Sequence, residues 1–330
     1  MTDPLRPAPE ERTAAERLAF GVVNLDKPAG PSAHQVAGWV RDLASDGLEA
    51  LVDANPGDDI AGDDTAGDDE AANRAGRQLR GRLRVDRAAH AGTLDPKVTG
   101  CLPMLLGEAT RMAQVFLEGQ KEYVSVLELH GPAPATLEST LAAFEGPIYQ
   151  KPPRKSAVSR RLRVREIHDL ELLEVSDRQA LLRIRCASGT YVRKLCHDLG
   201  LALGVGAHMG HLRRTATEPF DDRSLVTLGE LTDALVFAAE GDDRELRRIV
   251  QPAERALTHL PRVEIAPSAA RQVATGAPVY APGVISADPA DDDALVACYT
   301  PNGSAVCLGR MAGDPTADSG VAVDLERVLV

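Results

Sequence analysis

Asp95 is the strongest candidate for chemistry, because it stands immediately before a proline in the sequence H-A-G-T-L-D-P (90–96). A residue before proline is held in an extended or turn conformation, which leaves the Asp95 carboxylate accessible at a bend of the chain. A nucleophilic carboxylate must be ionised, and a nearby guanidinium favours this by lowering its pKa. Arg193 is the candidate for that charge, and Tyr123 is the candidate aromatic surface for a base. These residues form a nucleophilic site if the fold brings them together.

Other kinds of site are weaker. The glycines of G-V-G-A-H-M-G (204–210) do not fit the dinucleotide fingerprint, and a helix rather than a strand is expected before them. Neither a G-x-S-x-G elbow nor a phosphate-binding G-x-x-x-x-G-K-[ST] loop occurs. One group of possible metal ligands was weighed: Cys196, His197, His208 and His211. Only His208 and His211 have a usual ligand spacing, so we interpret the group as core or surface residues. No cofactor or metal is predicted.

The elements that must position the candidates follow from hydrophobic periodicity. Ser32 and Gln35 form a capping box that opens a helix, with Val36, Trp39, Val40 and Leu43 on one stripe. A short helix carrying Leu137, Leu141 and Phe144 is predicted to close at Gly146. The remaining predicted elements are strands at 20–25, 122–129 and 180–186 and an amphipathic helix at 191–203. Because strands and helices interleave without a regular repeat, we expect an α+β fold with a mixed, largely antiparallel sheet flanked by helices.

The sequence pattern of the chain changes near Leu257. Four short strand-like pieces then alternate with Gly and Pro turns, and one short helix (268–275) stops at Gly276. This pattern is typical of a small β-barrel-like module. We therefore predict an N-terminal extension (1–18), a catalytic domain (19–257) and a C-terminal module (258–330).

Composition limits the setting of the protein. The 330 residues carry 49 acids against 37 bases, a net charge of -12, and only six of the bases are lysine. Such an acidic, lysine-poor composition is expected of a salt-adapted cytoplasm, so net charge does not exclude a nucleic-acid partner. No apolar run approaches the roughly 18 residues of a membrane helix, and no secretory signal is recognisable. The five cysteines, without any C-x-x-C pair, are interpreted as reduced core residues.

Charge is also unevenly distributed along the chain. An acidic stretch (about 45–73) reads as a solvated insertion, and two basic clusters follow it at 74–87 and 151–165. A basic cluster is usually a solvated face. In so acidic a protein, these two also suggest phosphate contacts.

Several motifs together resemble the TruB-type RNA pseudouridine synthases. They are N-L-D-K-P-A-G-P-S (24–32), H-A-G-T-L-D-P-K-V-T-G-C-L-P (90–103), L-E-G-Q-K-E-Y (117–123), G-T-Y-V-R (189–193) and G-V-G-A-H-M-x-x-L-R-R-T (204–215). The segment Q-K-P-P-R-K-S-A-V-S-R-R-L-R-V-R (150–165) is similar to the archaeal and eukaryotic dyskerin branch. The resemblance covers nearly all of residues 19–330, and it identifies the C-terminal module as a PUA RNA-binding domain.

The resemblance implies roles for individual residues. Asp95 would be the catalytic nucleophile on a flipped uridine, paired with Arg193, and Tyr123 would stack on the base and serve in proton transfer. The implied substrate-binding residues are His90, Tyr191, Leu212 and Lys27, the last in a motif that supports the active-site loop. The chain departs from the family at Ala89, where glycine is usual, and in its longer acidic stretch.

The resemblance also implies partners. Its members isomerise uridine in the T-arm of tRNA or, with an H/ACA guide RNA and small particle proteins, in rRNA, without a cofactor. Two alternatives remain open at this point. One is a non-catalytic RNA-binding scaffold, for which Asp95 would be dispensable, and the other is a small-molecule α/β enzyme.

Overall fold

The predicted strands assemble into a mixed ten-stranded sheet in the computed structural model, which describes residues 4–54, 85–117, 119–152, 159 and 161–330. Its order is β10-β1-β3-β8-β4-β7-β6-β5, with β2 paired to β3 and β9 to β8. All pairs are antiparallel except β3 with β8. The strands are β1 (Gly21–Lys27), β2 (Ala88–His90), β3 (Thr99–Leu106), β4 (Lys121–Leu129), β5 (Gly146–Gln150), β6 (Arg163–Ser176), β7 (Gln179–Cys186), β8 (Ala207–Thr217), β9 (Phe220–Asp221) and β10 (Gln251–Pro252).

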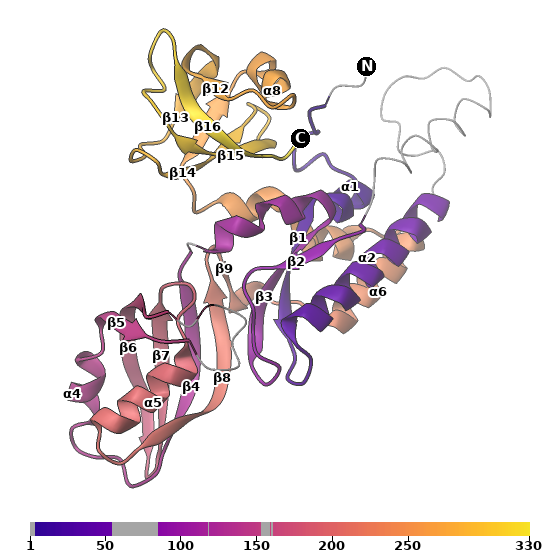
Figure 1. Cartoon of the computed structure of the whole chain (residues 1–330). Helices are drawn as coiled ribbons and strands as arrows, with labels where there is room; N and C mark the ends of the chain where they lie inside the picture. The colour runs from indigo at the N-terminus through magenta and orange to yellow at the C-terminus, as the bar shows by residue number, and fades with distance from the viewer. Residues whose placement is uncertain (1–3, 55–84, 118, 153–158, 160) are drawn as a thin grey trace, which may run out of the picture.

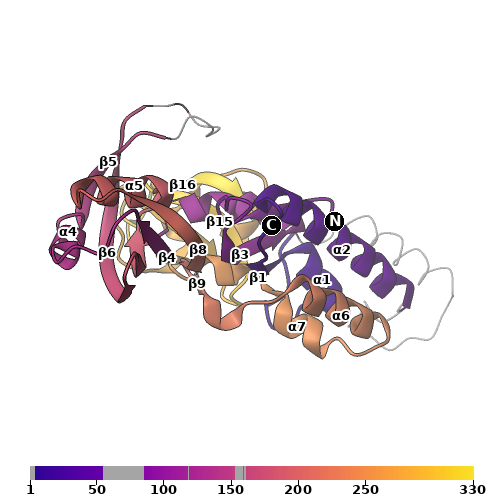
Figure 2. The ribbon, with the colours of Figure 1, turned by 90° about the horizontal axis from the view of Figure 1, so that it is seen from below.

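Helices cover this sheet in two groups (Figures 1 and 2). Near β1 lie α1 (Ala14–Ala19), α2 (Ala33–Ala54), α6 (Leu228–Ala239) and α7 (Arg244–Ile249); at the other end lie α4 (Leu137–Ala142) and α5 (Val192–Ala202). Strand β4 alternates buried and half-buried residues along its whole length, as a strand with one covered face must. The described 3₁₀ segments are η1 (Gly107–Leu117), η2 (Asp222–Ser224), η3 (Ala253–Leu257) and η4 (Ala281–Gly283).

The capping box that opens α2 is confirmed, because Gln35 N donates to Ser32 Oγ and Ser32 N to Gln35 Oε1. The predicted stripe is wrong at Trp39, which is 46% exposed whereas Val36 is fully buried. Three residues turn a helix by about 300°, so Trp39 lies at the edge of the apolar face. The helix also continues through the first part of the predicted acidic insertion, because Leu48 and Leu51 extend the buried stripe. The rest of that insertion (55–73) lies outside the described residues.

Helix α4 differs from its prediction at the C-terminal end. It stops at Ala142, four residues before the expected Gly146. Gly146 has a positive φ of 91° and instead begins β5, so its freedom from a Cβ serves the turn into that strand.

The C-terminal residues form a second, six-stranded sheet of order β12-β16-β15-β14-β11-β13 beside the short helix α8 (Pro267–Val273). Its strands are β11 (Arg262–Ile265), β12 (Val279–Tyr280), β13 (Val284–Ala287), β14 (Leu295–Tyr299), β15 (Ala305–Met311) and β16 (Val321–Val328). A single apolar cluster crosses the predicted boundary at 257/258, since Phe20, Leu105 and Phe116 pack with Leu308 and Leu329. The two sheets therefore share part of their core.

The N-terminal segment reinforces this junction. Arg12 is 1% exposed and donates to both carboxylate oxygens of Glu254, at 2.8 and 2.7 Å, and to Ser304 Oγ at 2.9 Å. Arg6 donates to the carbonyl of Leu329, and its guanidinium lies 3.8 Å from the ring centre of Phe20. Figure 1 shows this indigo segment beside the C-terminus.

All five cysteines are free and buried, as predicted. None of the described helices combines the length and the apolar character needed to span a membrane.

Candidate active site

The Asp95 loop joins β2 to β3, and the side chain of Lys27 binds its backbone. Lys27 is fully buried, and its Nζ donates to the carbonyls of Pro28, Pro96 and Val98 at 2.9, 3.1 and 2.8 Å. Burial lowers the pKa of this amine. Gly30 N also donates to Pro96 O, at 2.9 Å. The N-L-D-K-P segment at the end of β1 thus fixes the backbone on the C-terminal side of Asp95.

Asp95 and Arg193 form an ion pair. Arg193 is the second residue of α5, and Asp95 comes from the loop, so the pair joins residues 98 positions apart. Their side chains are 55% and 53% exposed, which leaves the carboxylate open to solvent. A guanidinium beside an accessible carboxylate favours the ionised, nucleophilic form.

Tyr123 lies on β4 and is 9% exposed, within the main core. Its partners across the sheet are Ile184 on β7 and Arg214 on β8. Burial raises the pKa of the Tyr123 phenol, and the Arg214 guanidinium opposes that increase. The predicted aromatic residue therefore lies on β4, which pairs with β7, the strand that precedes α5. Its side chain is mostly covered.

Tyr191 and Leu212 come from two different elements, the start of α5 and the strand β8. Tyr191 is the N-cap of α5. Its backbone N–H donates a hydrogen bond to Gln150 Oε1 at 2.9 Å. Gln150 Nε2 donates in return to Tyr191 O at 3.2 Å. Leu212 faces Ser125 in the β4–β8 register and packs against the main core.

His90 ends β2, opposite Met104. Its Nδ1 is buried without a hydrogen-bond partner among the described residues. Burial is the main cause that lowers its pKa, with the positive charge of Arg214 acting in the same direction. A neutral imidazole with a free ring nitrogen five residues before Asp95 is suited to a polar contact with a ligand.

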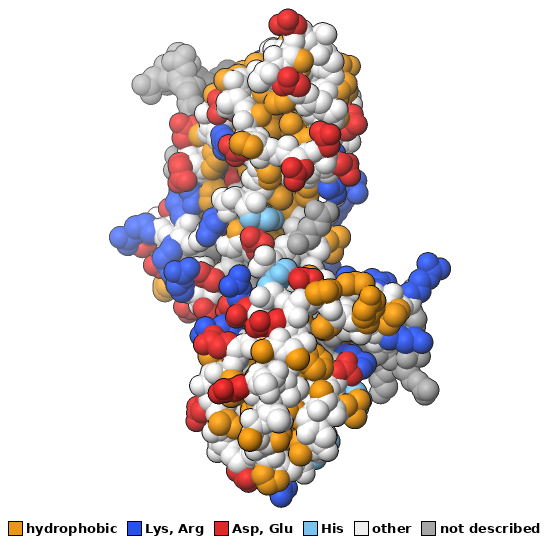
Figure 3. All heavy atoms as spheres, turned by 90° about the vertical axis from the view of Figure 1, so that its left-hand side faces the viewer, with side chains coloured by type: hydrophobic (Ala, Val, Ile, Leu, Met, Phe, Trp, Pro, Cys, Tyr) orange, Lys and Arg blue, Asp and Glu red, His pale blue; other side chains and the backbone are white. Residues whose placement is uncertain are grey.

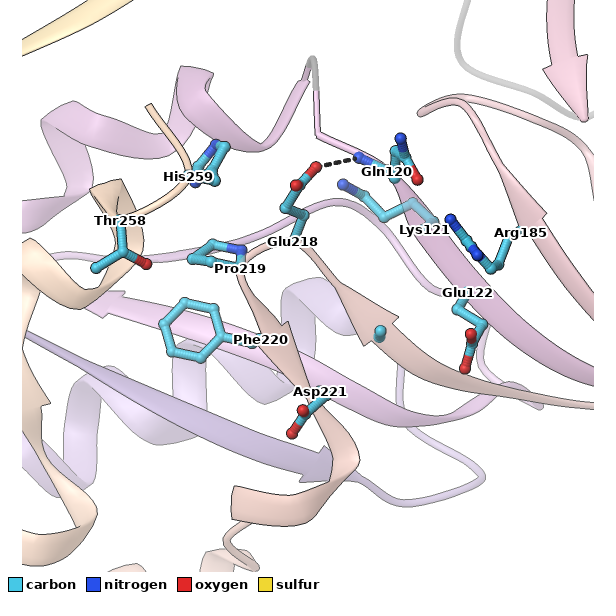
Figure 4. Close-up of a pocket in the computed structure, with 11 residues that line it drawn as sticks. Gln120, Lys121, Glu122, Arg185, Glu218, Pro219, Phe220, Asp221, Thr258 and His259 are labelled. Carbon is cyan, nitrogen blue, oxygen red and sulfur yellow. Dashed lines mark hydrogen bonds between the residues drawn. The ribbon is translucent and has the colours of Figure 1, made fainter. Parts of the chain in front are cut away.

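A pocket of about 350 Å³ lies on another part of the sheet (Figure 4). Lys121, Glu218, Phe220 and His259 help to line it, and Glu218 accepts a hydrogen bond from Gln120 N at 3.1 Å. None of the residues that line it is Asp95, Arg193 or Tyr191. Asp95 is itself more than half exposed, and such an accessible carboxylate suits a macromolecular substrate better than an enclosed small molecule.

Part of the two basic clusters lies among the described residues. Arg87, Lys151 and Arg161 are exposed, and Arg165 Nε donates to Gly189 O at 3.1 Å, next to the G-T-Y-V-R motif. The cluster residues at 74–84, Arg154, Lys155 and Arg160 lie outside the described residues.

Two contacts at the site were missed by the sequence analysis. The two carboxylate oxygens of Asp26 accept hydrogen bonds from Nη1 and Nη2 of Arg213, each at 3.0 Å. Arg214 donates to the carbonyl of Gly92 in the Asp95 loop. Both arginines belong to the quoted L-R-R-T motif, so the motif was noticed but its partners, over 100 residues away, were not.

Four segments of the chain match known domain families. Residues 80–135 match the TruB family pseudouridylate synthase N-terminal domain, 193–258 the tRNA pseudouridylate synthase B C-terminal domain, 6–37 the DKCLD (NUC011) domain and 261–329 the PUA domain. The probable tRNA pseudouridine synthase B of Halobacterium salinarum is 58% identical, over 99% of both chains. The chain belongs to the TruB family. This TruB-family chain is a pseudouridine synthase, hence an isomerase, as the motifs predicted.

Other relatives agree with this assignment. The probable tRNA pseudouridine synthase B of Haloarcula marismortui is 57% identical over 99% of this chain and 94% of its own. Both organisms are halophilic archaea, in keeping with the salt adaptation inferred from composition. Among solved structures, a Cbf5-Nop10-Gar1 complex contains a chain that matches with a TM-score of 0.82 and 37% identity, covering 100% of this chain and 91% of that one. An H/ACA RNP bound to a substrate RNA containing 2'-deoxyuridine matches at 0.80 and 35%, covering 100% and 92%. The predicted fold is confirmed.

Proposed function

We propose that this pseudouridine synthase isomerises a flipped uridine of structured RNA, with Asp95 as the nucleophile. The observation that carries the proposal is the ion pair of Asp95 with Arg193 on an exposed loop. That loop is immobilised by the three carbonyl contacts of the buried Lys27. Rigid placement of an ionised carboxylate is what nucleophilic catalysis requires.

The isomerisation of uridine can proceed with these side chains and needs no cofactor. The bond between uracil N1 and the ribose C1′ breaks, the base turns, and a new bond forms through C5, which loses its proton while N1 gains one. The same ionised carboxylate serves attack at C1′ of the sugar or at C6 of the base. Arg193 keeps that carboxylate ionised and aimed, because a planar guanidinium pairs with a carboxylate in a defined orientation.

The base would be held by the other predicted residues. We place Tyr123 against the uracil ring, with Tyr191 and Leu212 lining the remainder of its site and His90 in contact with the flipped nucleotide. Because Tyr123 is almost covered in the free protein, RNA binding must open its access. Extrusion of a base costs a few kcal/mol, which stacking and phosphate contacts must offset.

The substrates follow from the relatives. The relatives from Halobacterium salinarum and Haloarcula marismortui are named as probable tRNA pseudouridine synthases B. The matching structures are a Cbf5-Nop10-Gar1 complex and an H/ACA RNP bound to a substrate RNA. We infer that this chain acts on the T-arm of tRNA by itself and on rRNA with an H/ACA guide RNA and small particle proteins. These reactions would take place in the cytoplasm.

The decisive experiment compares Asp95→Asn with wild type in high-salt buffer on tRNA, and on an rRNA fragment with and without guide RNA and partner proteins. The amide keeps the size of Asp95 but is not a nucleophile, so we expect pseudouridine formation to disappear while the RNA dissociation constant changes by less than about threefold. Asp242→Asn is the matched control, because Asp242 is also an exposed acid paired with an arginine, Arg244. Turnover by Asp95→Asn within about tenfold of wild type would refute the assignment.

A further inference from the structure

Arg214 lies on β8 where this strand separates β3 from β4. It is opposite Tyr123 of β4 and beside Gly100 of β3, and it is 1% exposed. Its neighbour Arg213 differs, because Arg213 pairs with Asp26 and its side chain is 39% exposed. Successive side chains of a strand point to opposite faces, so only Arg214 enters the interior behind the candidate active site.

The Arg214 guanidinium contacts backbone carbonyls instead of an acid. Its Nε donates to Cys101 O at 2.7 Å and its Nη2 to Gly92 O at 3.3 Å. Among the described residues, no carboxylate comes within the 4.0 Å of an ion pair with it. A buried cation without an acidic partner is costly, and groups of this kind concentrate at functional sites.

The guanidinium meets the Asp95 loop at Gly92. Its φ is +95°, and a Cβ at this position would lie 3.5 Å from Arg214 Nη1. Gly92 is three residues before Asp95, whereas the contacts of Lys27 are with Pro96 and Val98 just after it. Arg214 and Lys27 therefore hold the loop on the two sides of its aspartate.

The same guanidinium acts on the aromatic residue of the site. Arg214 is the partner of Tyr123 in the β4–β8 register. Burial raises the pKa of the Tyr123 phenol, and the positive charge of Arg214 opposes that rise. Lys121 is another buried amine nearby: burial first, and then the positive charge of Arg214, lower its pKa to about 8. Loop, phenol and positive charge thus meet at one arginine.

We propose that Arg214 is a positioning residue for the isomerisation: it binds the Asp95 loop from the position opposite Tyr123, so that it sets the loop relative to β4, and its charge favours the electron-rich uracil. When the C1′–N1 bond breaks, the electron pair of that bond stays on the base and the sugar carbon becomes electron-poor. Bond formation through C5 returns a pair to that carbon, C5 releases its proton and N1 takes one up. A fixed positive charge behind the base stabilises the intermediate stage of this exchange. The inference rests on the proposed placement of the uridine between Asp95 and Tyr123.

The first test separates binding from chemistry. Arg214→Met and Arg214→Lys are compared with wild type by the single-turnover rate at saturating tRNA and by the RNA dissociation constant. We expect Arg214→Met to lose roughly 100-fold or more in rate with affinity within about threefold, and Arg214→Lys, which keeps the charge but not the fork, to lose about tenfold. Arg244→Met, at an exposed arginine of α7, is the matched control and should behave as wild type.

A second test detects the guanidinium itself. In Arg214→Ala, added methylguanidinium chloride should raise the rate at least about tenfold over the same concentration of KCl, which a purely structural role of Arg214 would not produce. If Arg214→Met fails to fold, Arg214→Lys decides. A rate within about threefold of wild type for Arg214→Met, or for Arg214→Lys in that case, overturns the inference. Asp95→Asn is measured in parallel, because turnover by that variant would refute the proposed site, whereas an inactive Asp95→Asn beside an active Arg214→Met refutes only the role of Arg214.

Discussion

The ion pair of Asp95 and Arg193 is more than half exposed, so water screens it and its contribution to folding is at most about 1 kcal/mol. Its value lies in orientation. We predict that Arg193→Lys leaves the free energy of unfolding within about 1 kcal/mol of wild type, yet lowers the single-turnover rate roughly 10-fold to 100-fold, because a point charge does not replace a planar fork. Chemical unfolding and a rate measurement on the same preparation check this. An unchanged rate would show that Asp95 needs only a nearby charge.

Lys121 gives a pH prediction. It is 4% exposed, its Nζ donates to Phe116 O and Gly119 O, and burial lowers its pKa from 10.5 to about 8. Between these values the unfolded chain binds more protons than the folded one, so stability rises with pH. Relative to Lys121→Met, wild type should gain up to about 3 kcal/mol of unfolding free energy between pH 8 and 10.5. Parallel unfolding curves for the two proteins across this range would contradict the prediction.

The limits of sequence prediction are visible at the same residues. Local periodicity was enough to place β4 and α5, and motif resemblance was enough to associate Asp95 with Arg193. The pairing of Tyr123 with Arg214 across β4 and β8 could not be predicted from the sequence, because a register shift between Glu122 and Tyr123 determines it. Without that bulge Tyr123 would face Thr215, and no pattern within either strand reveals a bulge that depends on both.

At the scale of elements, α5 must approach β8 closely to bring Arg193 to its partner. A Cβ on Gly200 would lie 2.0 Å from the backbone nitrogen of Ala207, so the helix packs against this strand without room for a side chain. We predict that Gly200→Ala destabilises the protein by about 1–3 kcal/mol through overpacking. Because the helix must shift, the rate on tRNA should fall as well.

The control for this prediction is another helical glycine. Gly38 of α2 has nothing within 4 Å of its Cβ position, so Gly38→Ala should stabilise the helix by up to about 1 kcal/mol. Thermal unfolding of both variants at one salt concentration provides the comparison. Equal effects would mean that α5 yields easily, and that its position is not fixed by the contact with β8.

At the scale of the whole molecule, charge must be reconciled with an RNA substrate. On the face shown in Figure 3 the charged side chains of the upper, C-terminal part are mainly acidic, and residues 258–330 hold four arginines against nine acids. We expect RNA affinity to depend on the basic clusters of the catalytic domain. The dissociation constant should then follow salt with a log–log slope of about 0.7–0.9 per neutralised phosphate. A slope near zero in titrations with KCl would show that these clusters do not contact RNA.

The shared core changes one expectation drawn from the sequence. The predicted boundary at 257/258 suggests that removing residues 258–330 would weaken RNA-guided activity more than it harms folding of the catalytic domain. The packing of Phe20, Leu105 and Phe116 against Leu308 and Leu329 opposes this, because deletion would expose an apolar surface. We therefore predict that a chain ending at residue 257 loses several kcal/mol of stability and aggregates, which thermal unfolding and size-exclusion chromatography would detect. A monomeric fragment of undiminished stability would contradict it.

The contacts of Arg12 also have a consequence for how the protein is made. Residues are added from the N-terminus onward, yet Arg12 is buried against Glu254 and Ser304, and Arg6 bonds to Leu329. A segment that is translated early is thus among the last to reach its native place. Until then Arg6 and Arg12 lack these partners, and the junction forms only after translation has reached Leu329.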